Sequence, residues 1–228
     1  MKYSTQRQTL VTLGRRLWER GMVAANDGNL SLRLDDGSVL ATPTGVSKGF
    51  MTPEAMVHLA ADGTPLSAGK ASSEIKMHLA VYEERPDIHA VVHAHPIFAT
   101  SFAVAEISLN QALLPEAVLF LGAVPLAPYG APSTAEIPRD VRPLIRKGDA
   151  VLLAHHGALT IGADLETAYY RMETLEHAAQ ISYRARQLGP LKPLPEHRIH
   201  ELVALRQKYG MTGKVDLSGF GLSTEEVD

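Results

Sequence analysis

Cysteine is absent from this chain of 228 residues. The sequence therefore excludes disulfide bonds and thiolate metal sites, and any transition metal has to be held by histidine, aspartate or glutamate. Ten histidines are present. They are the first candidates for metal ligands.

Long apolar runs and strong charge are also lacking. No stretch approaches the roughly 18 apolar residues of a membrane-spanning helix, and the polar N-terminus has no signal-peptide core. Lys and Arg number 22 and Asp and Glu number 25, a net charge of −3. This balance provides no basic surface for nucleic acid or an anionic membrane. We expect a cytoplasmic protein that binds neither.

The remaining composition is that of an ordinary folded protein. Hydrophobic residues make up 45% and charged residues 21% of the chain, which excludes a disordered protein. A chain of this length can bury a sizeable core. We expect a single domain over residues 1–228, with a loose tail at 210–228.

Apolar periodicity predicts strands mixed with helices. An Asp-Gly turn at 36–37 joins two short strands into a hairpin. Other strands are expected at residues 88–93 and 149–154, and helices around 10–18, from 72 to 85, after Pro96, and at 163–188 and 196–209. Hairpins together with helices favour α/β layers around a mixed sheet.

Histidines follow two of these strands. In the His-Ala-His run, His93 and His95 share one strand face and can converge on one ion. His155 and His156 follow the second strand, and only one of these two adjacent side chains should reach the same ion. Gly157 permits a turn that could aim His156 into a cleft. Read alone, each pair is also compatible with ordinary histidines at a strand end.

Three short segments have the composition of anion-binding loops. Ser72 and Ser73 precede a predicted helix, whose free N–H groups attract anions, and Glu74 follows them. Residues 26–29 (Asn-Asp-Gly-Asn) and 42–45 (Thr-Pro-Thr-Gly) allow close backbone approach. Each is also compatible with a plain turn or helix start. No Walker or GxGxxG motif supports nucleotide binding.

Taken together and in this order, these motifs resemble the class II aldolase/adducin-head superfamily, and in particular its L-fuculose-phosphate aldolase branch. The resemblance covers about residues 10–209. It implies a single-domain, three-layer α/β/α fold with a central mixed, largely antiparallel sheet. It also implies a homotetramer with active sites at the subunit interfaces.

The resemblance assigns roles to particular residues. It implies that His93, His95 and His156 bind Zn²⁺, or alternatively Mn²⁺ or Co²⁺, with Glu74 as the fourth ligand and the catalytic base. It places the phosphate of a sugar-phosphate substrate among six residues: Gly28, Asn29, Thr44, Gly45, Ser72 and Ser73.

The expected activity is that of a lyase, a class II aldolase. It would cleave a ketose 1-phosphate, such as L-fuculose 1-phosphate or a 5-deoxypentulose 1-phosphate, to dihydroxyacetone phosphate and an aldehyde through a metal-stabilised enediolate. The same scaffold serves pentulose-phosphate 4-epimerases and methylthioribulose-1-phosphate dehydratases, and both remain alternatives. A third is a non-catalytic domain like the adducin head, in which the ligands have degenerated.

Two further residues are weaker candidates for catalysis. Glu116 lies in an apolar stretch, and related epimerases and dehydratases have an acidic residue near this point, whereas the fuculose enzyme has a tyrosine nearby. Tyr209 matches a C-terminal Tyr-Gly of the fuculose-type enzyme. A helix N-terminus and an aromatic packing contact explain these two residues equally well. Lys48 could approach the phosphate, but a solvated loop lysine is the favoured interpretation.

Overall fold

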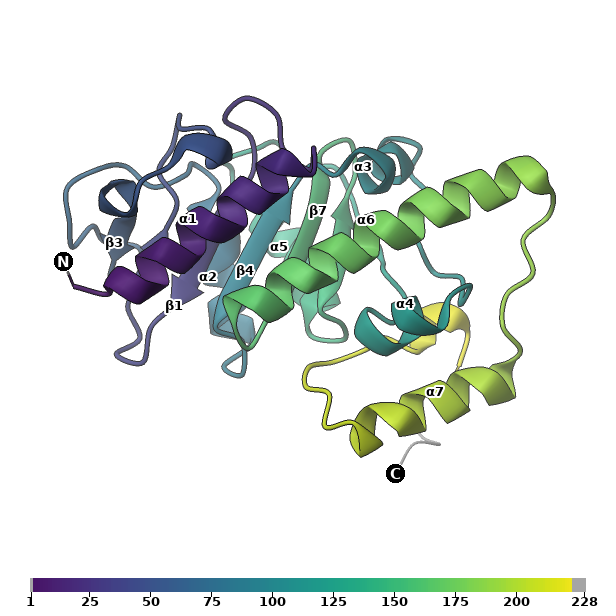
Figure 1. Ribbon diagram of the computed structural model, residues 1–228. Helices are drawn as coiled ribbons and strands as arrows, with labels where there is room; N and C mark the ends of the chain where they lie inside the picture. The colour runs from purple at the N-terminus through teal and green to yellow at the C-terminus, as the bar shows by residue number, and fades with distance from the viewer. Residues whose placement is uncertain (1, 223–228) are drawn as a thin grey trace.

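The computed structural model describes residues 2–222 and contains one sheet of seven strands (Figure 1). The strands stand in the order β3-β2-β1-β4-β7-β6-β5, and every neighbouring pair is antiparallel except β5 and β6. The expected mixed, largely antiparallel sheet is thus confirmed. The strands are β1 (Asn29–Arg33), β2 (Val39–Ala41), β3 (Val57–Leu59), β4 (Ala90–Ala94), β5 (Leu126–Ala127), β6 (Ala150–Leu153) and β7 (Gly157–Gly162).

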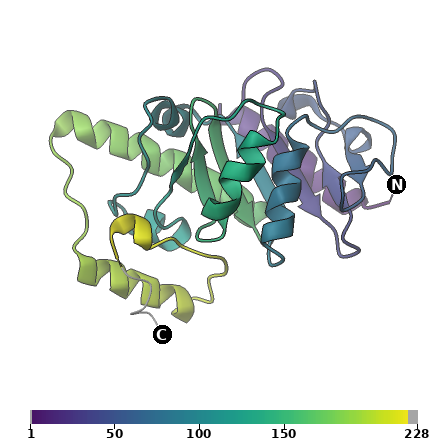
Figure 2. The ribbon, with the colours of Figure 1, turned by 180° about the vertical axis from the view of Figure 1, so that it is seen from behind.

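Helices cover both faces of this sheet. Figure 1 shows α1 (Ser4–Glu19) and α6 (Leu165–Leu188) on one face, and Figure 2 shows α2 (Ile75–Glu84) and α5 (Glu136–Ile145) on the other. Helix α3 (Ile97–Val104) follows β4 directly. The short α4 (Pro115–Phe120) packs against α6 and α7 (Glu196–Lys208) at one end of the molecule. Three 3-10 helices, η1 (Lys48–Phe50), η2 (Pro53–Ala55) and η3 (Ser218–Phe220), complete the described chain.

Side-chain alternation in the central strands builds two cores. In β4, Ala90 and Val92 join the core beneath α1 and α6, whereas Val91 joins the core beneath α2 and α5. Leu152 and Val151 of β6 divide in the same way. Because both faces are covered, β4, β6 and β7 are buried throughout.

The segment after Gly210, which the sequence predicts to be loose, is held against the core as far as the structure describes it. Asp149 is fully buried, and its carboxylate accepts hydrogen bonds from Arg85 (2.9 Å) and from the backbone N–H of Lys214 (2.9 Å). It also forms an ion pair with Arg171 at 2.8 Å. Arg171 in turn donates to the carbonyl of Thr212. One buried carboxylate therefore joins α2, α6 and the C-terminal segment.

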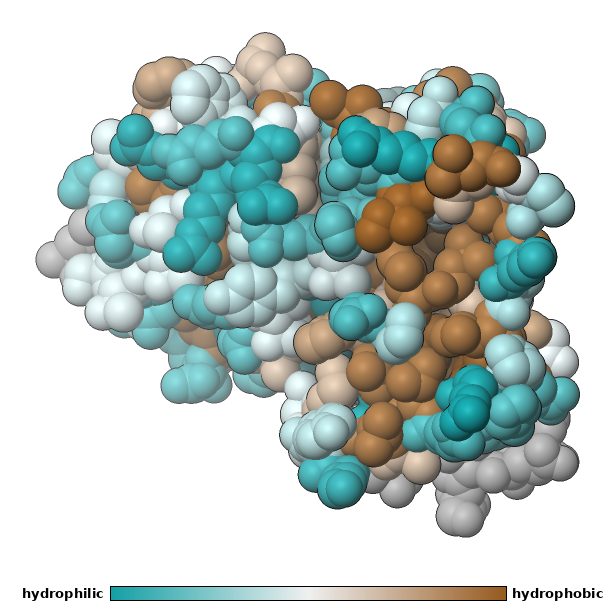
Figure 3. Space-filling model, turned by 45° about the vertical axis from the view of Figure 1, so that its right-hand side comes forward, coloured by the Kyte–Doolittle hydropathy of each residue, from teal (hydrophilic) through white to brown (hydrophobic). Residues whose placement is uncertain are grey.

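Apolar side chains gather on one outer face of the molecule (Figure 3). The face is hollowed by a small pocket between α4, α6 and residues 108–114. Phe120 of α4 and Tyr183 of α6 are partly exposed, and Leu188 at the end of α6 is 92% exposed. None of the helices in residues 2–222 has the length and apolar composition needed to cross a bilayer.

Candidate metal centre

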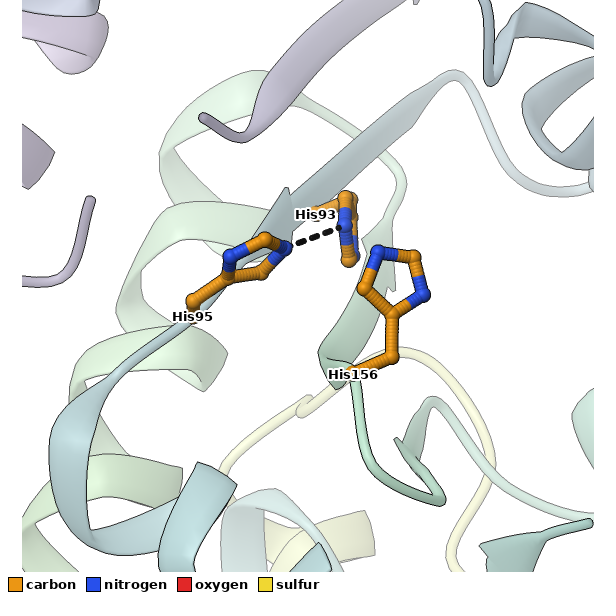
Figure 4. A group of neighbouring side chains, drawn as sticks. All are labelled: His93, His95 and His156. Carbon is orange, nitrogen blue, oxygen red and sulfur yellow. Dashed lines mark hydrogen bonds between the residues drawn. The ribbon is translucent and has the colours of Figure 1, made fainter. Parts of the chain in front are cut away.

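Three imidazoles converge at the ends of neighbouring strands (Figure 4). His93 is buried near the end of β4, His95 follows this strand, and His156 lies in the turn between β6 and β7. One nitrogen of each ring lies within 4.8 Å of the others. Strands β4 and β7 are hydrogen-bonded neighbours, with Ala94 opposite Ala158, which brings the two histidine motifs together.

The turn that aims His156 differs from the sequence expectation. The residue with left-handed backbone is His155 (φ 54°), not Gly157, and the N–H of His156 closes the turn onto the carbonyl of Leu153. Glycine is required at position 157 for another reason, namely that there is no room for a side chain. A Cβ at this position would lie 2.5 Å from the carbonyl oxygen of Ala94 and 2.6 Å from Cδ2 of His95.

Neighbouring groups hold two of the rings in fixed orientations. Nδ1 of His93 donates to the carbonyl of Ala158 at 2.9 Å, so the lone pair of this ring is on Nε2. Nδ1 of His95 faces the carboxylate of Asp27 at 3.5 Å, while its Nε2 lies 3.1 Å from Nε2 of His93. Both inward nitrogens are therefore free to bind a cation, in the way that metal-bound histidines are usually supported. The sequence predicts Asp27 only as part of a candidate anion-binding loop, and its contact with His95 was missed.

Glu74 adds a carboxylate to the cluster. It is the residue that immediately precedes α2. Its oxygens lie 3.3 Å from Nε2 of His93 and 3.2 Å from Nε2 of His156. The side-chain amide of Asn29 donates to the same carboxylate at 2.9 Å. Since Asn29 is paired with His93 across β1 and β4, the sheet register fixes this contact.

The donor set fits a divalent metal ion. Ligands at about 2.0–2.1 Å in a tetrahedral shell lie about 3.3–3.4 Å apart. Three pairs of these atoms (His93–His95, His93–Glu74 and His156–Glu74) are separated by 3.1–3.3 Å, and the nitrogens of the triad all lie within 4.8 Å of one another. In addition, Oε1 of Glu74 is buried without a hydrogen-bond donor. Three imidazoles and a carboxylate suit Zn²⁺ and related ions.

The electrostatics of the site favour the forms that bind metal. Burial and the neighbouring His93 lower the pKa of His156 to about 4, and they also lower the pKa of His95. Burial opposes ionisation of Glu74, but His93, His156 and Asn29 outweigh it and hold the pKa of this carboxyl well below its usual range. Near neutral pH, His95 and His156 thus offer lone pairs and Glu74 offers a negative charge.

The triad opens into a cleft with about 580 Å³ of empty space. Its lining includes His95, His156 and Glu74 together with all six residues expected to hold a phosphate: Gly28, Asn29, Thr44, Gly45, Ser72 and Ser73. Gly28 (φ 70°) and Gly45 (φ 71°) both have left-handed backbone, which glycine adopts without strain. Ser72 Oγ accepts the N–H of Glu74 at 3.3 Å. Five separate segments of sequence thus contribute to one surface.

Glu116 and Tyr209 are not brought to this cleft. Glu116 lies in the first turn of α4 and is exposed, and Tyr209 follows α7 with 65% of its surface exposed. Helices α4 and α7 lie side by side, away from the turn between β4 and α3 (Figure 1). Within one chain, neither residue can act on a molecule bound at the triad.

Comparisons with known proteins agree with this geometry. Residues 8–183 match the model of the class II aldolase and adducin N-terminal domain. The chain belongs to this family. It is an enzyme of the class II aldolase superfamily, a lyase with a histidine triad consistent with the divalent-metal site typical of the family, and its family implies sugar-phosphate substrates.

Relatives within the family carry more than one activity. The chain is 36% identical to a 3-oxo-tetronate 4-phosphate decarboxylase of Escherichia coli K12 over 181 residues, which cover 78% of this chain and 85% of that protein. It is 34% identical to an L-fuculose phosphate aldolase of Methanococcus maripaludis over 173 residues, 76% of this chain and 93% of the relative. A solved L-fuculose 1-phosphate aldolase superposes with a TM-score of 0.85 at 28% identity, covering 92% and 99% of the two chains.

The packing of Gly157 leads to a first prediction for this class II aldolase homologue. In Gly157→Ala, the new methyl group would overlap the ring of His95 and displace it from the triad. We expect the affinity for zinc to fall by about ten-fold or more, the range seen when the groups supporting metal ligands are removed. Titration of the chelated protein with zinc measures this change.

Gly148→Ala is the matched control. A Cβ at Gly148 would meet its nearest neighbour at 3.5 Å, an ordinary contact distance. Unchanged zinc affinity in both variants would contradict the explanation given for Gly157.

Proposed function

We propose that this chain is a metal-dependent lyase that breaks a carbon–carbon bond beside the ketone of a phosphorylated substrate and yields dihydroxyacetone phosphate. One observation carries the proposal: His95, His156, Glu74 and the six expected phosphate-binding residues line a single cleft, and the buried His93 completes the triad beside it. We propose His93, His95, His156 and Glu74 as the ligands, with Zn²⁺ as the cofactor and Mn²⁺ or Co²⁺ as substitutes.

When bound, such an ion would polarise the ketone and stabilise the negative charge that bond cleavage leaves on the adjacent carbon. The residues of this chain supply the remaining functions. The hydroxyl groups of Thr44, Ser72 and Ser73 hold the phosphate, which fixes the reacting carbon relative to the triad. Asp27 and the carbonyl of Ala158 keep the imidazoles in position.

Glu74 is the group placed to exchange a proton with the substrate carbon. Its carboxylate is ionised and borders the cleft. An incoming ketone can take its place among the ligands, which frees the carboxylate to carry a proton. In the cleaving direction Glu74 delivers a proton taken from solvent to the new carbanion, and in the condensing direction it removes that proton.

We propose carbon dioxide as the leaving group. Loss of the carboxylate from a 3-oxo-tetronate 4-phosphate leaves a three-carbon ketone phosphate, and a decarboxylase acting on this substrate is 36% identical to the chain. Decarboxylation requires no second base. Among residues 2–222, the carboxylates that line the cleft are Glu74 and Asp27, and Asp27 already faces His95.

Aldol cleavage of a ketose 1-phosphate is the second candidate. It yields the same dihydroxyacetone phosphate, and L-fuculose phosphate aldolases are also similar to this chain. It requires a further group to handle the oxygen of the departing aldehyde. Glu116 or Tyr209 would have to supply this group from a neighbouring subunit.

The test is an assay of the purified, zinc-loaded protein for dihydroxyacetone phosphate. We expect product from 3-oxo-tetronate 4-phosphate together with carbon dioxide, loss of activity with a chelator, and recovery when zinc is restored. An aldehyde formed from L-fuculose 1-phosphate or 5-deoxypentulose 1-phosphate would favour the second candidate. Chelator-resistant activity would contradict the metal-dependent mechanism.

Product NMR distinguishes the remaining alternatives. A pentulose-phosphate 4-epimerase or a methylthioribulose-1-phosphate dehydratase would keep the carbon skeleton intact. A non-catalytic domain like the adducin head would bind no metal, and the metal content of the purified protein tests this directly. The presence of all the candidate ligands argues against that alternative.

We also propose a homotetramer with sites at the subunit interfaces. The apolar face seen in Figure 3 suits burial against another copy. Light scattering should give the mass of four 24.7 kDa chains. If Glu116 acts across an interface, Glu116→Gln will lower turnover, and mixing this variant with a Glu74 variant will restore part of it. A monomer, or unchanged turnover, would remove Glu116 from the mechanism.

A further inference from the structure

The side chain of Lys48 lies inside the protein, and the expectation of a solvated loop lysine is wrong. Lys48 begins η1, and only 1% of its surface is exposed. Its Nζ donates to the carbonyl of Asn26 at 3.0 Å and to that of Val46 at 2.7 Å. These acceptors use two of the three protons of the ammonium group.

The positive charge of the Lys48 ammonium group has no counter-ion among the described residues. Among residues 2–222, no carboxylate oxygen lies within ion-pair distance of Nζ. Burial lowers the pKa of Lys48 to about 8, and the more distant Asp27 only partly opposes this shift. A buried charge without a counter-ion is costly. The surroundings of Lys48 therefore lack one negative charge.

The position of Lys48 indicates where this negative charge would come from. Its two carbonyl acceptors belong to the loops that contain Gly28 and Gly45, and Lys48 itself lines the cleft with Ser72 and Ser73. Of the described residues that line this cleft, Lys48 is the single lysine or arginine. The six residues expected to hold the phosphate contain no charged side chain.

We infer that Lys48 is the cationic ligand of the substrate phosphate and makes the cleft selective for phosphorylated over unphosphorylated substrates. The inference rests on the proposed function in one respect, namely that the cleft binds a phosphorylated substrate. With two of its N–H groups fixed on the flanking loops, the ammonium group directs the third toward an anion held at Thr44 and Ser72. Binding then supplies the missing counter-charge in a partly desolvated site.

Calorimetric titration with inorganic phosphate tests the inference without any turnover. We expect the dissociation constant of the zinc-loaded protein to rise by about ten- to a hundred-fold in Lys48→Met and in Lys48→Gln, as for loss of one charge-assisted hydrogen bond. The glutamine variant keeps N–H donors without the charge. A repeat after chelation separates phosphate at Lys48 from phosphate bound to the metal.

Lys70→Met is the matched control, because Lys70 is exposed in the neighbouring loop and lies outside the cleft lining. Phosphate affinity should be unchanged in this variant. Unchanged affinity in folded Lys48 variants, with or without lower melting temperatures, would overturn the inference and leave Lys48 a structural clamp. If neither variant folds, a crystal of the wild-type protein with phosphate decides, since an anion in the cleft without contact to Nζ would also overturn it.

Steady-state kinetics can distinguish loss of the Lys48 charge from a general distortion of the surrounding loops. Once a substrate is known, the Lys48 variants should raise KM for the phosphorylated compound far more than for its unphosphorylated analogue, with little change in kcat. Failure of every lyase assay would contradict the proposed function but would leave the phosphate titration, and this inference, intact.

Discussion

The Glu74→Gln substitution is expected to lower kcat by about 10²–10⁴-fold, the usual contribution of a positioned acid–base group. Glutamine keeps the size of the side chain and can still accept the hydrogen bond from Asn29. It cannot carry a proton to or from the substrate carbon. Steady-state kinetics on the substrate identified by product analysis will measure the loss.

Zinc content separates this chemical role from metal binding. We expect Glu74→Gln to retain the ion on the triad, because three imidazoles suffice for a catalytic zinc site. Glu83→Gln is the control, since this exposed carboxylate lies on the same α2 but pairs with Arg142, remote from the cleft. Near-normal kcat in zinc-loaded Glu74→Gln would exclude Glu74 as the proton carrier.

The Asp149→Asn substitution is expected to lower the free energy of unfolding by about 3–5 kcal/mol. It would leave the guanidinium groups of Arg85 and Arg171 buried without their common counter-ion. For a chain of this size the melting temperature should fall by about 6–20 °C. Urea unfolding and calorimetry measure the two quantities.

Asp87→Asn provides the comparison. Asp87 pairs with the same Arg85, but 54% of its side chain is exposed. Exposed pairs contribute up to about 1 kcal/mol, so this variant should stay close to the wild type. Equal effects of the two substitutions would show that burial of Asp149 is not what makes its ion pairs important.

The four proposed metal ligands could be named from the sequence because their residue types and their order along the chain resemble the motifs of the family. His93 and His95 follow one apolar run, His156 follows another, and Glu74 follows two serines. Their convergence depends on β7, which was not predicted. This strand begins and ends with glycine, is buried on both faces and follows the His-His turn directly, so it lacks an alternating pattern of its own.

Contacts between distant segments were harder to anticipate. The sequence around Lys48 is typical of a loop and favoured a solvated side chain. In the structure, however, its ammonium group donates to the carbonyls of Asn26 and Val46. Asp27 faces His95, although 68 positions separate the two residues in the sequence. Such contacts depend on how loops fold back on the sheet, which local pattern does not report.

The pairing of Asn29 with His93 has a consequence for how new activities could arise on this scaffold. If β1 slipped by one residue along β4, Asn29 would turn to the face opposite His93, so the ladder tolerates no gradual adjustment. Divergence toward a different sugar would therefore have to proceed through a loop at the rim, such as residues 128–135, which contributes Pro132 to the cleft. Engineering of new specificity is best confined to such a loop, with the strands left as they are.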